Sequence, residues 1–316
     1  MTRLPSISRR KFLAQTAGLA AVSSLAGCGS VAQEKMRTRT IPGTNESIPV
    51  SALGSPDVFY ITPEGETDEL PKTLIQTMYD LGGRLIDTPA WFRPDPPVVG
   101  PMIQEMNLED ELFLVGKITV DGREAATEHL NKTIANLGKR PLDLMLLHNL
   151  RDAENTWPVL EEAKAEGRVR YIGTSEASMT IGNDVLEKFM RDQQPDFIMP
   201  ANSISLDAAE DRILPLAEDM GIAVISIEAF KLGPDDGAYF SVTADKELPE
   251  WAAEFDCESW AQFGLKYTLS HPAVTCVATE TSKPNHVVDN MGAGYGRLPD
   301  QAMRKQMQEY FRTLLV

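Results

Sequence analysis

The stretch that decides the fold reads Gly82-Gly83-Arg84-Leu85-Ile86-Asp87-Thr88-Pro89-Ala90-Trp91-Phe92. A helix-like run ends at the two glycines, and the short apolar run after them predicts a strand whose carboxyl end carries Asp87. α/β barrels keep their chemistry at that end of the strands, so Asp87 is a candidate site residue. The alternative is an Asp that only turns the chain before Thr88-Pro89.

Two later apolar runs also end in a polar residue. Lys117 closes the run 112–116, and His148 closes the run 142–147. Helix and strand signals alternate as far as a last strand over 274–278 and a terminal helix over 301–315, which predicts an α/β fold, a (β/α)8 TIM barrel. In such a barrel the strand ends that carry Asp87, Lys117 and His148 meet in one mouth.

Before the first barrel strand, residues 38–42 and 48–51 flank a turn-rich link and predict a β-hairpin. Near the other end, the loop Thr279-Glu280-Thr281-Ser282-Lys283-Pro284 opens a helix that carries Asp289-Asn290. With the three strand ends, these motifs resemble the aldo-keto reductase family from about residue 37 to the C-terminus. The resemblance implies a (β/α)8 barrel whose hairpin plugs the bottom and which reduces carbonyls with NADPH.

The resemblance also implies Asp, Tyr, Lys and His in the mouth, with the Tyr as proton donor five residues after the Asp. The fifth residue after Asp87 is Phe92, which has no proton to give. General acid catalysis is typically worth about 10²- to 10⁴-fold in rate, so carbonyl reduction is expected to be weak or altered.

The candidate catalytic residues are therefore Asp87, Lys117 and His148. A buried lysine needs a carboxylate partner, so we expect a Lys117–Asp87 ion pair, either catalytic or purely architectural. His148 either orients a carbonyl oxygen, donates a proton if its pKa is near neutral, or is a structural histidine. Trp91 and Phe92 form an aromatic lip that suits a small carbonyl or apolar ligand.

The resemblance further implies a nicotinamide site. The matching positions are Ser175 for the carboxamide, and Glu280, Thr281, His286, Asp289 and Asn290 for the adenosine end. Glu280 would repel a 2′-phosphate and accept hydrogen bonds from ribose hydroxyls, so NAD(H) is favoured over NADP(H) if a dinucleotide binds.

Two departures from the family pattern remove expected contacts to the nicotinamide. Glu176 stands where an Asn is usual, and the expected glutamine is absent from the stretch 199–203, where Asn202 or Ser203 could supply part of its role. No metal site is predicted.

The N-terminus predicts export. Ser8-Arg9-Arg10-Lys11-Phe12-Leu13 and the apolar stretch 14–25 resemble a twin-arginine signal, and Leu25-Ala26-Gly27-Cys28 resembles a lipobox that acylates Cys28. A transmembrane anchor is the alternative, but the apolar stretch is shorter than the roughly 20 residues a span requires. We therefore expect a signal peptide over 1–27, a tether over 28–37 and the barrel over 38–316, in a membrane-anchored lipoprotein on the periplasmic side.

The net charge bears on the binding partners, and the cysteines bear on whether a disulfide forms. Removing Arg3, Arg9, Arg10 and Lys11 with the signal takes the formal charge from −16 to −20, which makes nucleic acid an improbable partner and leaves the Cys28 lipid as the membrane contact. An exported protein could pair Cys257 with Cys276, but no disulfide framework is present, so free buried thiols are favoured.

Two functions fit these features. One is an exported nicotinamide-dependent carbonyl reductase whose proton donor is His148 or water. The other is a noncatalytic lipoprotein that uses the barrel as a ligand-binding or assembly scaffold. The Gly-, Asp- and Pro-rich insertion 231–249 lies on the mouth side, as a lid or cofactor loop or as an ordinary solvated excursion.

Overall fold

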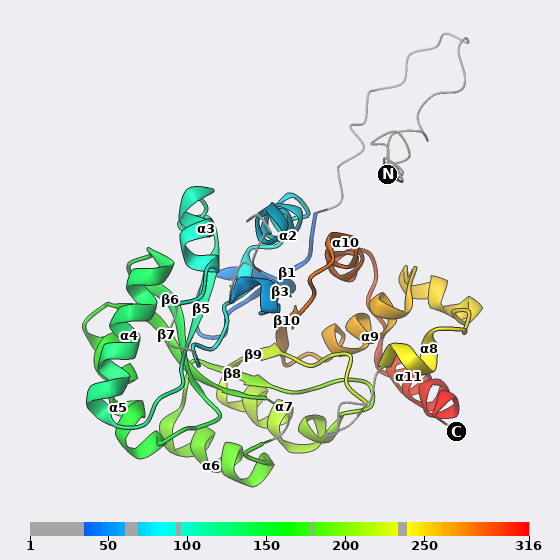
Figure 1. Ribbon diagram of the computed structural model, residues 1–316. Coiled ribbons are helices and arrows are strands. Elements are labelled where there is room, and N and C mark those ends of the chain that lie inside the picture. Colours follow the sequence, from blue (N-terminus) through cyan, green and yellow to red (C-terminus); the bar gives the residue numbers. More distant parts are fainter. Residues whose placement is uncertain (1–34, 61–68, 93–95, 178–179, 233–238, 316) are drawn as a thin grey trace, which may run out of the picture. The chain divides into compact units, whose positions relative to one another are not determined.

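Parallel strands close into a barrel in the order β10-β3-β4-β5-β6-β7-β8-β9, with helices around the outside (Figure 1). This closure confirms the predicted (β/α)8 architecture. The barrel strands are β3 (Ser51–Leu53), β4 (Leu85–Asp87), β5 (Phe113–Ile118), β6 (Leu142–His148), β7 (Val169–Glu176), β8 (Phe197–Pro200), β9 (Ala223–Ser226) and β10 (Val274–Thr279).

The computed structural model describes residues 35–60, 69–92, 96–177, 180–232 and 239–315. The predicted twin-arginine signal and lipobox, including Cys28, lie outside the described residues. Among the residues that are described, no helix has the length and apolar character needed to cross a membrane. Cys257 and Cys276 are both free and buried, as predicted.

The helices alternate with the strands along the chain. They are α2 (Glu69–Asp80), α3 (Val99–Glu105), α4 (Arg123–Leu137), α5 (Ala153–Ala165), α6 (Asn183–Gln193), α7 (Ala208–Met220), α8 (Tyr239–Thr243), α9 (Trp260–Leu269), α10 (Pro284–Gly292) and α11 (Gln301–Leu314), with short 3-10 turns η1 (Asp57–Phe59) and η2 (Glu250–Phe255).

The stretch that decides the fold behaves as its sequence predicts. Helix α2 buries Leu74 and Met78, and the chain leaves it through Gly82, whose φ of +84° favours glycine. A Cβ at Gly83 would lie 2.5 Å from the Met78 side chain, so only glycine fits between helix and strand. The turn delivers β4, which is buried along its whole length as expected for a parallel strand covered on both faces.

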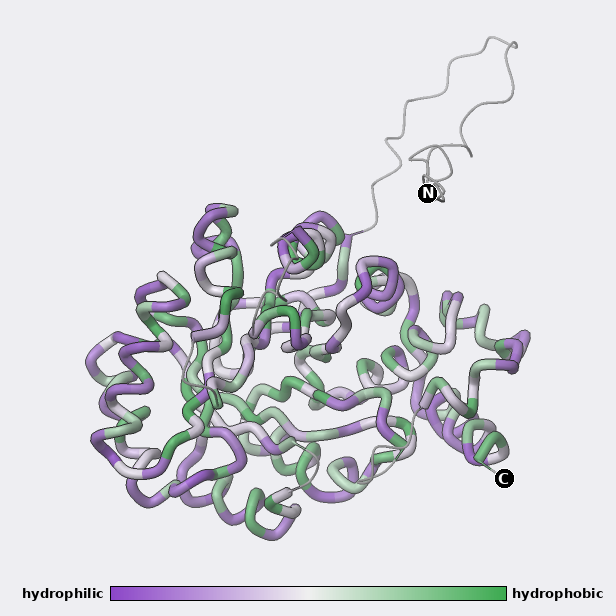
Figure 2. The backbone as a smooth tube through the Cα atoms, in the orientation of Figure 1, coloured by the Kyte–Doolittle hydropathy of each residue, from purple (hydrophilic) through white to green (hydrophobic). Residues whose placement is uncertain are grey.

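Apolar side chains fill the barrel and the layer between strands and helices. The barrel interior holds one cluster that includes Leu85, Leu144, Phe197 and Ile225. Figure 2 shows hydrophobic segments along the strands and hydrophilic stretches along the outer helices. Burial of these runs supplies the main driving force for folding and leaves the polar strand ends at the mouth.

The N-terminal hairpin is also present. Strands β1 (Thr38–Thr40) and β2 (Ser47–Pro49) pair antiparallel, and Ile41 and Ile48 pack into the same cluster as the barrel interior. Glu46 accepts a hydrogen bond from Tyr171 at the amino-terminal end of β7, 2.8 Å away. The hairpin therefore closes the bottom of the barrel and leaves the opposite end open for ligands.

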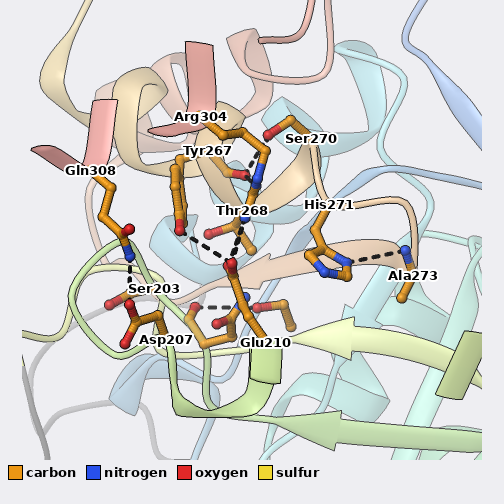
Figure 3. A network of polar contacts seen from close by, with 12 residues as sticks. Ser203, Asp207, Glu210, Tyr267, Thr268, Ser270, His271, Ala273, Arg304 and Gln308 are labelled. Atoms are coloured by element: carbon orange, nitrogen blue, oxygen red, sulfur yellow. Dashed lines mark hydrogen bonds and ion pairs between the residues drawn. The ribbon is translucent and has the colours of Figure 1, made fainter. Parts of the chain in front are cut away.

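A polar network connects the C-terminal helix α11 to the outer helices α7 and α9 (Figure 3). Arg304 of α11 makes a two-point ion pair with Glu210 of α7, at 2.7 and 2.8 Å, and its guanidinium lies 4.1 Å from the Tyr267 ring centroid. The insertion after β9 contains helix α8, and its residues 233–238 lie outside the described part.

Candidate active site

Asp87 and Lys117 meet as predicted, at the ends of neighbouring strands. Asp87 pairs in register with Val115 on β5, and Lys117 lies two residues farther along. The Lys117 ammonium donates to Asp87 Oδ1 and, at 2.8 Å, to the carbonyl of Thr88. Both side chains are over 90% buried, so the pair is desolvated, and two of the three ammonium hydrogens have acceptors.

A serine supports this pair from the first barrel strand. Ser55, just beyond β3, donates from its hydroxyl to the Asp87 carbonyl at 2.7 Å and lies 3.3 Å from the Asp87 carboxylate. Asp87 is therefore held by its main chain and its side chain together, which fixes the start of the loop that leads to Phe92.

His148 lies beside Ser175, its register partner on β7. Nδ1 of the imidazole is 2.9 Å from the serine hydroxyl, and if the serine donates, Nε2 carries the imidazole hydrogen. Burial, with smaller contributions from the charges of Lys117 and Arg151, lowers the pKa of His148 to about 4. The imidazole is neutral at pH 7, so the condition for His148 to be the proton donor, a pKa near neutral, is not met.

One cavity of about 650 Å³ brings the candidate residues together at the mouth. Its lining includes six positions singled out from the sequence, namely Asp87, Phe92, Lys117, His148, Ser175 and Glu280. The loops that follow β4 and β9 contribute Phe92 and Phe230 to its lining. Its size suits a small ligand.

Phe92 forms one wall of this cavity. Its ring meets the His148 ring edge to face with the centroids 5.4 Å apart, and its side chain is 59% exposed. The phenyl group carries no donor, so Phe92 itself brings no hydroxyl to the mouth. The neighbouring residue Trp91 packs edge to face against His129 of α4 and does not line this cavity, so only the Phe92 half of the predicted aromatic lip faces the mouth.

A tyrosine that the sequence reasoning missed also lines the cavity. Tyr60 follows η1 in the loop after the first barrel strand, and its hydroxyl donates to the carbonyl of Ala90 at 2.7 Å. That proton is engaged with the loop backbone, so the geometry gives Tyr60 a structural contact. The only sequence signal was an aromatic residue shortly after a strand end, which is too common to single out.

The part of the cavity expected to hold the nicotinamide carboxamide departs further from the family pattern than the part that holds Asp87, Lys117 and His148. Met199, the register partner of Ser175 on β8, lines the cavity with a thioether, which is at most a weak hydrogen-bond acceptor. Glu176 is 3% exposed, and its carboxylate accepts hydrogen bonds from the backbone of Gly182 and Ile181 at 2.7 and 3.2 Å. Burial raises the pKa of this carboxyl group. Glu176 thus fastens a loop.

Neither substitute for the missing glutamine lines the cavity. Ser203 donates its hydroxyl to the backbone carbonyl of Lys231 at 2.7 Å. Asn202 is fully buried, and within the described part of the chain its side-chain amide has no hydrogen-bond partner.

The adenosine-end candidates separate into two groups. Asp289 accepts from Ser259 at the start of α9 at 2.7 Å and so joins two outer helices. Asn290 is buried and donates to Thr279 of β10 at 3.1 Å, which ties α10 to the barrel. Thr281 and His286 lie 3.4 Å apart near the start of α10 and do not line the cavity. The remaining member of this set, Glu280, does line it.

Glu280 stands among other carboxylates. Partial burial and then the charges of Asp57 and Asp87 raise its pKa, against a smaller opposing effect of Lys117. An anionic phosphate is favoured by basic groups and backbone amides, and the carboxylates around Glu280 oppose it. Over the described residues, no group of three or more His, Cys, Asp or Glu side chains is placed to hold a metal ion.

Comparisons with known proteins agree with the geometry. The glyoxal reductase of Bacillus subtilis is 24% identical over 238 residues, which is 74% of this chain and 79% of that protein. The holo form of an aldo-keto reductase from Bacillus halodurans superposes with a TM-score of 0.67 at 19% identity, covering 87% of this chain and 96% of that one.

An aldo/keto reductase from Klebsiella pneumoniae, crystallised with NADP and acetate, gives a TM-score of 0.67 at 20% identity and covers 88% of this chain and 96% of that one. At such low identities these structures establish the fold alone. The sequence profile of the Aldo/keto reductase family, however, matches residues 62–308, and the chain therefore belongs to that family.

Proposed function

We propose that the protein is a nicotinamide-dependent carbonyl oxidoreductase with weak activity, acting on a small carbonyl compound in the barrel mouth. One observation carries the proposal: the Asp87–Lys117 pair and the His148–Ser175 pair face a single cavity whose usual phenol position is Phe92. Family membership supports the reaction class, and the altered lining supports its weakness.

The residues present have separable roles in this reaction. The neutral imidazole of His148 directs an N–H at the carbonyl oxygen, and the aromatic wall of Phe92 packs against the substrate body. A reduced nicotinamide, when bound, supplies the hydride. Phe92 has no proton to give, His148 is neutral and the Tyr60 hydroxyl donates to Ala90, so we assign protonation of the alkoxide to water, at a cost of about 10²- to 10⁴-fold in rate.

NADH fits the site better than NADPH. The Klebsiella relative was crystallised with NADP, which supports binding of a nicotinamide dinucleotide by this fold. Here, however, Glu280 lies at the position that the family resemblance assigns to the 2′-phosphate contact, and Asp57 stands near it. A carboxylate repels the phosphate dianion and accepts hydrogen bonds from a ribose diol.

The proposal includes the compartment. The twin-arginine motif and the lipobox at Cys28 support export and a lipid anchor on the periplasmic side of the membrane. Export of an already folded chain suits a protein that must load a cofactor before it crosses the membrane.

A second candidate is a noncatalytic lipoprotein that binds a small ligand in the same mouth. Two observations favour it: Met199 replaces a hydrogen-bonding group beside Ser175, and Glu176 is committed to the backbone of Gly182. Both changes remove partners for a nicotinamide carboxamide while leaving the cavity intact.

Titration of the purified protein with NADH and NADPH, followed by tryptophan fluorescence, separates the two candidates. Saturable binding of NADH, tighter than that of NADPH and accompanied by slow reduction of benzaldehyde, supports the oxidoreductase. Absence of binding for both dinucleotides at millimolar concentration refutes it and leaves the ligand-binding scaffold. Glu280→Gln is the informative variant, because it should reduce the preference for NADH without altering the catalytic pair.

A further inference from the structure

We propose that the carbonyl substrate of the mouth carries a second arm, an uncharged planar ring with a hydroxyl group, and that this arm occupies a second cavity between helix α4 and the loop after β4. The inference deepens the proposed function by naming the class of its substrate. It rests on that function in placing the reacting carbonyl in the mouth.

The second cavity has a volume of about 350 Å³. Helix α4 contributes residues that are neighbours on one helical face, and the loops after β4 and β5 contribute the others. The lining includes Trp91, Phe92, Ala125, Glu128, His129 and Lys132. Because α4 follows the carboxyl end of β5, its first turns lie at the same end of the barrel as the mouth.

The two cavities adjoin at Phe92, which belongs to the lining of both. Its ring contacts His148 in the mouth, and its side chain is 59% exposed, which leaves ring surface open to a ligand. The preceding residue, Trp91, lines the second cavity, and its backbone carbonyl accepts a hydrogen bond from Thr119 at 2.8 Å. A substrate whose carbonyl lies beside His148 can therefore extend along Phe92 to Trp91.

The imidazole of His129 in this lining lacks a partner. The residue is only 7% exposed, and within the part of the chain that the structure describes its buried Nε2 has no hydrogen bond. The Trp91 ring packs edge to face against it with the centroids 5.8 Å apart, a contact that is at most a weak substitute. Buried polar atoms are normally paired, and a ligand hydroxyl suits an imidazole nitrogen in either tautomer because it can donate or accept.

The charges of this lining balance. Glu128 and Lys132 form an ion pair with each other at 2.6 Å. Burial, with a smaller contribution from Lys132, lowers the pKa of His129 to about 4, so this residue is neutral at pH 7. A charged arm would lose hydration without gaining an unpaired counter-charge, whereas the rings of Trp91 and Phe92 pack well against a flat apolar group. The lining therefore matches an uncharged planar ring.

The test measures how tightly the purified protein binds four alcohols, by isothermal titration calorimetry. The probes are benzyl alcohol, para-phenylbenzyl alcohol, its para-hydroxyphenyl analogue and its para-carboxyphenyl analogue. Burial of the second ring should lower the Kd by about tenfold relative to benzyl alcohol. The hydroxyl should lower it by about a further fivefold, and the carboxylate should cancel the gain from the ring.

Ala125→Phe fills the second cavity from an exposed position of α4, and it should abolish the gain from the second ring while keeping the affinity for benzyl alcohol. Ala135→Phe is the matched control, because Ala135 is also exposed on α4 but does not line the cavity, and it should leave the gain unchanged. His129→Phe should remove only the gain from the hydroxyl. Circular dichroism checks that each variant is folded.

Equal affinity for the one-ring and two-ring alcohols, or a ring gain that survives Ala125→Phe, overturns the inference, as does the absence of binding for all four probes. A hydroxyl gain that survives His129→Phe overturns the assignment of His129. The NADH titration judges the proposed oxidoreductase separately. A ring gain without NADH binding supports the second cavity and refutes the enzyme, and NADH binding without a ring gain does the reverse.

Discussion

Restoring a phenol at Phe92 tests the claim that the missing proton donor limits the reaction. Phe92→Tyr adds a hydroxyl to a ring that already lines the cavity with Lys117 and contacts His148 at a centroid distance of 5.4 Å. The change needs no repacking, because 59% of the side chain is exposed.

The size of the gain follows from the surroundings. Full general acid catalysis is worth up to about 10⁴-fold, but here the Lys117 ammonium is already bonded to Asp87 and to the carbonyl of Thr88. Its help in lowering the pKa of a new phenol is therefore partial. We expect a rise in kcat of about 10²-fold, equivalent to a barrier lower by about 2.7 kcal/mol.

The assay follows NADH oxidation with benzaldehyde at saturating cofactor. Phe230→Tyr, which places a hydroxyl on another ring of the same cavity, is the matched control and should not raise kcat. Adding Lys117→Met to Phe92→Tyr should remove most of the gain. If NADH binds but Phe92→Tyr is no faster than the natural protein, the missing acid is not what limits the reaction and the reasoning is refuted.

Three further predictions concern charge. Glu280→Lys should shift the ratio of the Kd values for NADH and NADPH by about tenfold in favour of NADPH, because it replaces a repulsive charge with an attractive one. Fluorescence titration measures both Kd values, and an unchanged ratio would place the phosphate elsewhere. Lys117→Met should lower the free energy of unfolding, measured in urea, by about 3–5 kcal/mol, because it leaves Asp87 buried without its cation. Adding Asp87→Leu should restore much of this loss. A loss of under about 1 kcal/mol would contradict the buried pair. The free energy of unfolding should fall as the pH drops from 6.5 toward 4, because burial lowers the folded-state pKa of three histidines from 6.5 to about 4 and the unfolded chain then binds more protons. Thermal unfolding between pH 7 and pH 5 measures how steeply stability depends on pH. His129→Gln should reduce this dependence, and exposed histidines would show none. The three histidines are His129, His148 and His271.

The fold and the catalytic cluster were predictable because both follow from strand ends. Alternating helix and strand signals indicate a closed parallel barrel, and in such a barrel the carboxyl ends of the strands converge. Asp87, Lys117 and His148 each close an apolar run, so their meeting required no knowledge of loops. The plug was predictable for a similar reason, since a short turn between two extended runs can only pair them with each other.

The rest of the site depends on facts that a linear pattern does not contain. Which residue of the stretch 199–203 faces the cavity is decided by strand register, and the structure selects Met199. Tyr60 reaches the mouth through the path of a loop. The pKa of His148 depends on its burial and on Lys117, neither of which is visible at position 148 alone. Asp289 and Asn290 matched a motif, yet their bonds go to the start of α9 and to β10.

The Asp87–Lys117 pair does not by itself distinguish an enzyme from a scaffold. Once an ammonium is buried at a strand end, removing its carboxylate costs several kcal/mol, so the pair is stable whether or not a phenol stands beside it. Its bonds to Thr88 and Ser55 also hold the loop that shapes the cavity. The two functions therefore share this geometry and differ in what the mouth binds. A dinucleotide needs hydrogen-bonding groups beside Ser175 and tolerance of phosphate at Glu280, whereas the small ligand of a scaffold needs neither. Binding measurements at these two ends of the cavity consequently decide the function more directly than the presence of catalytic residues does.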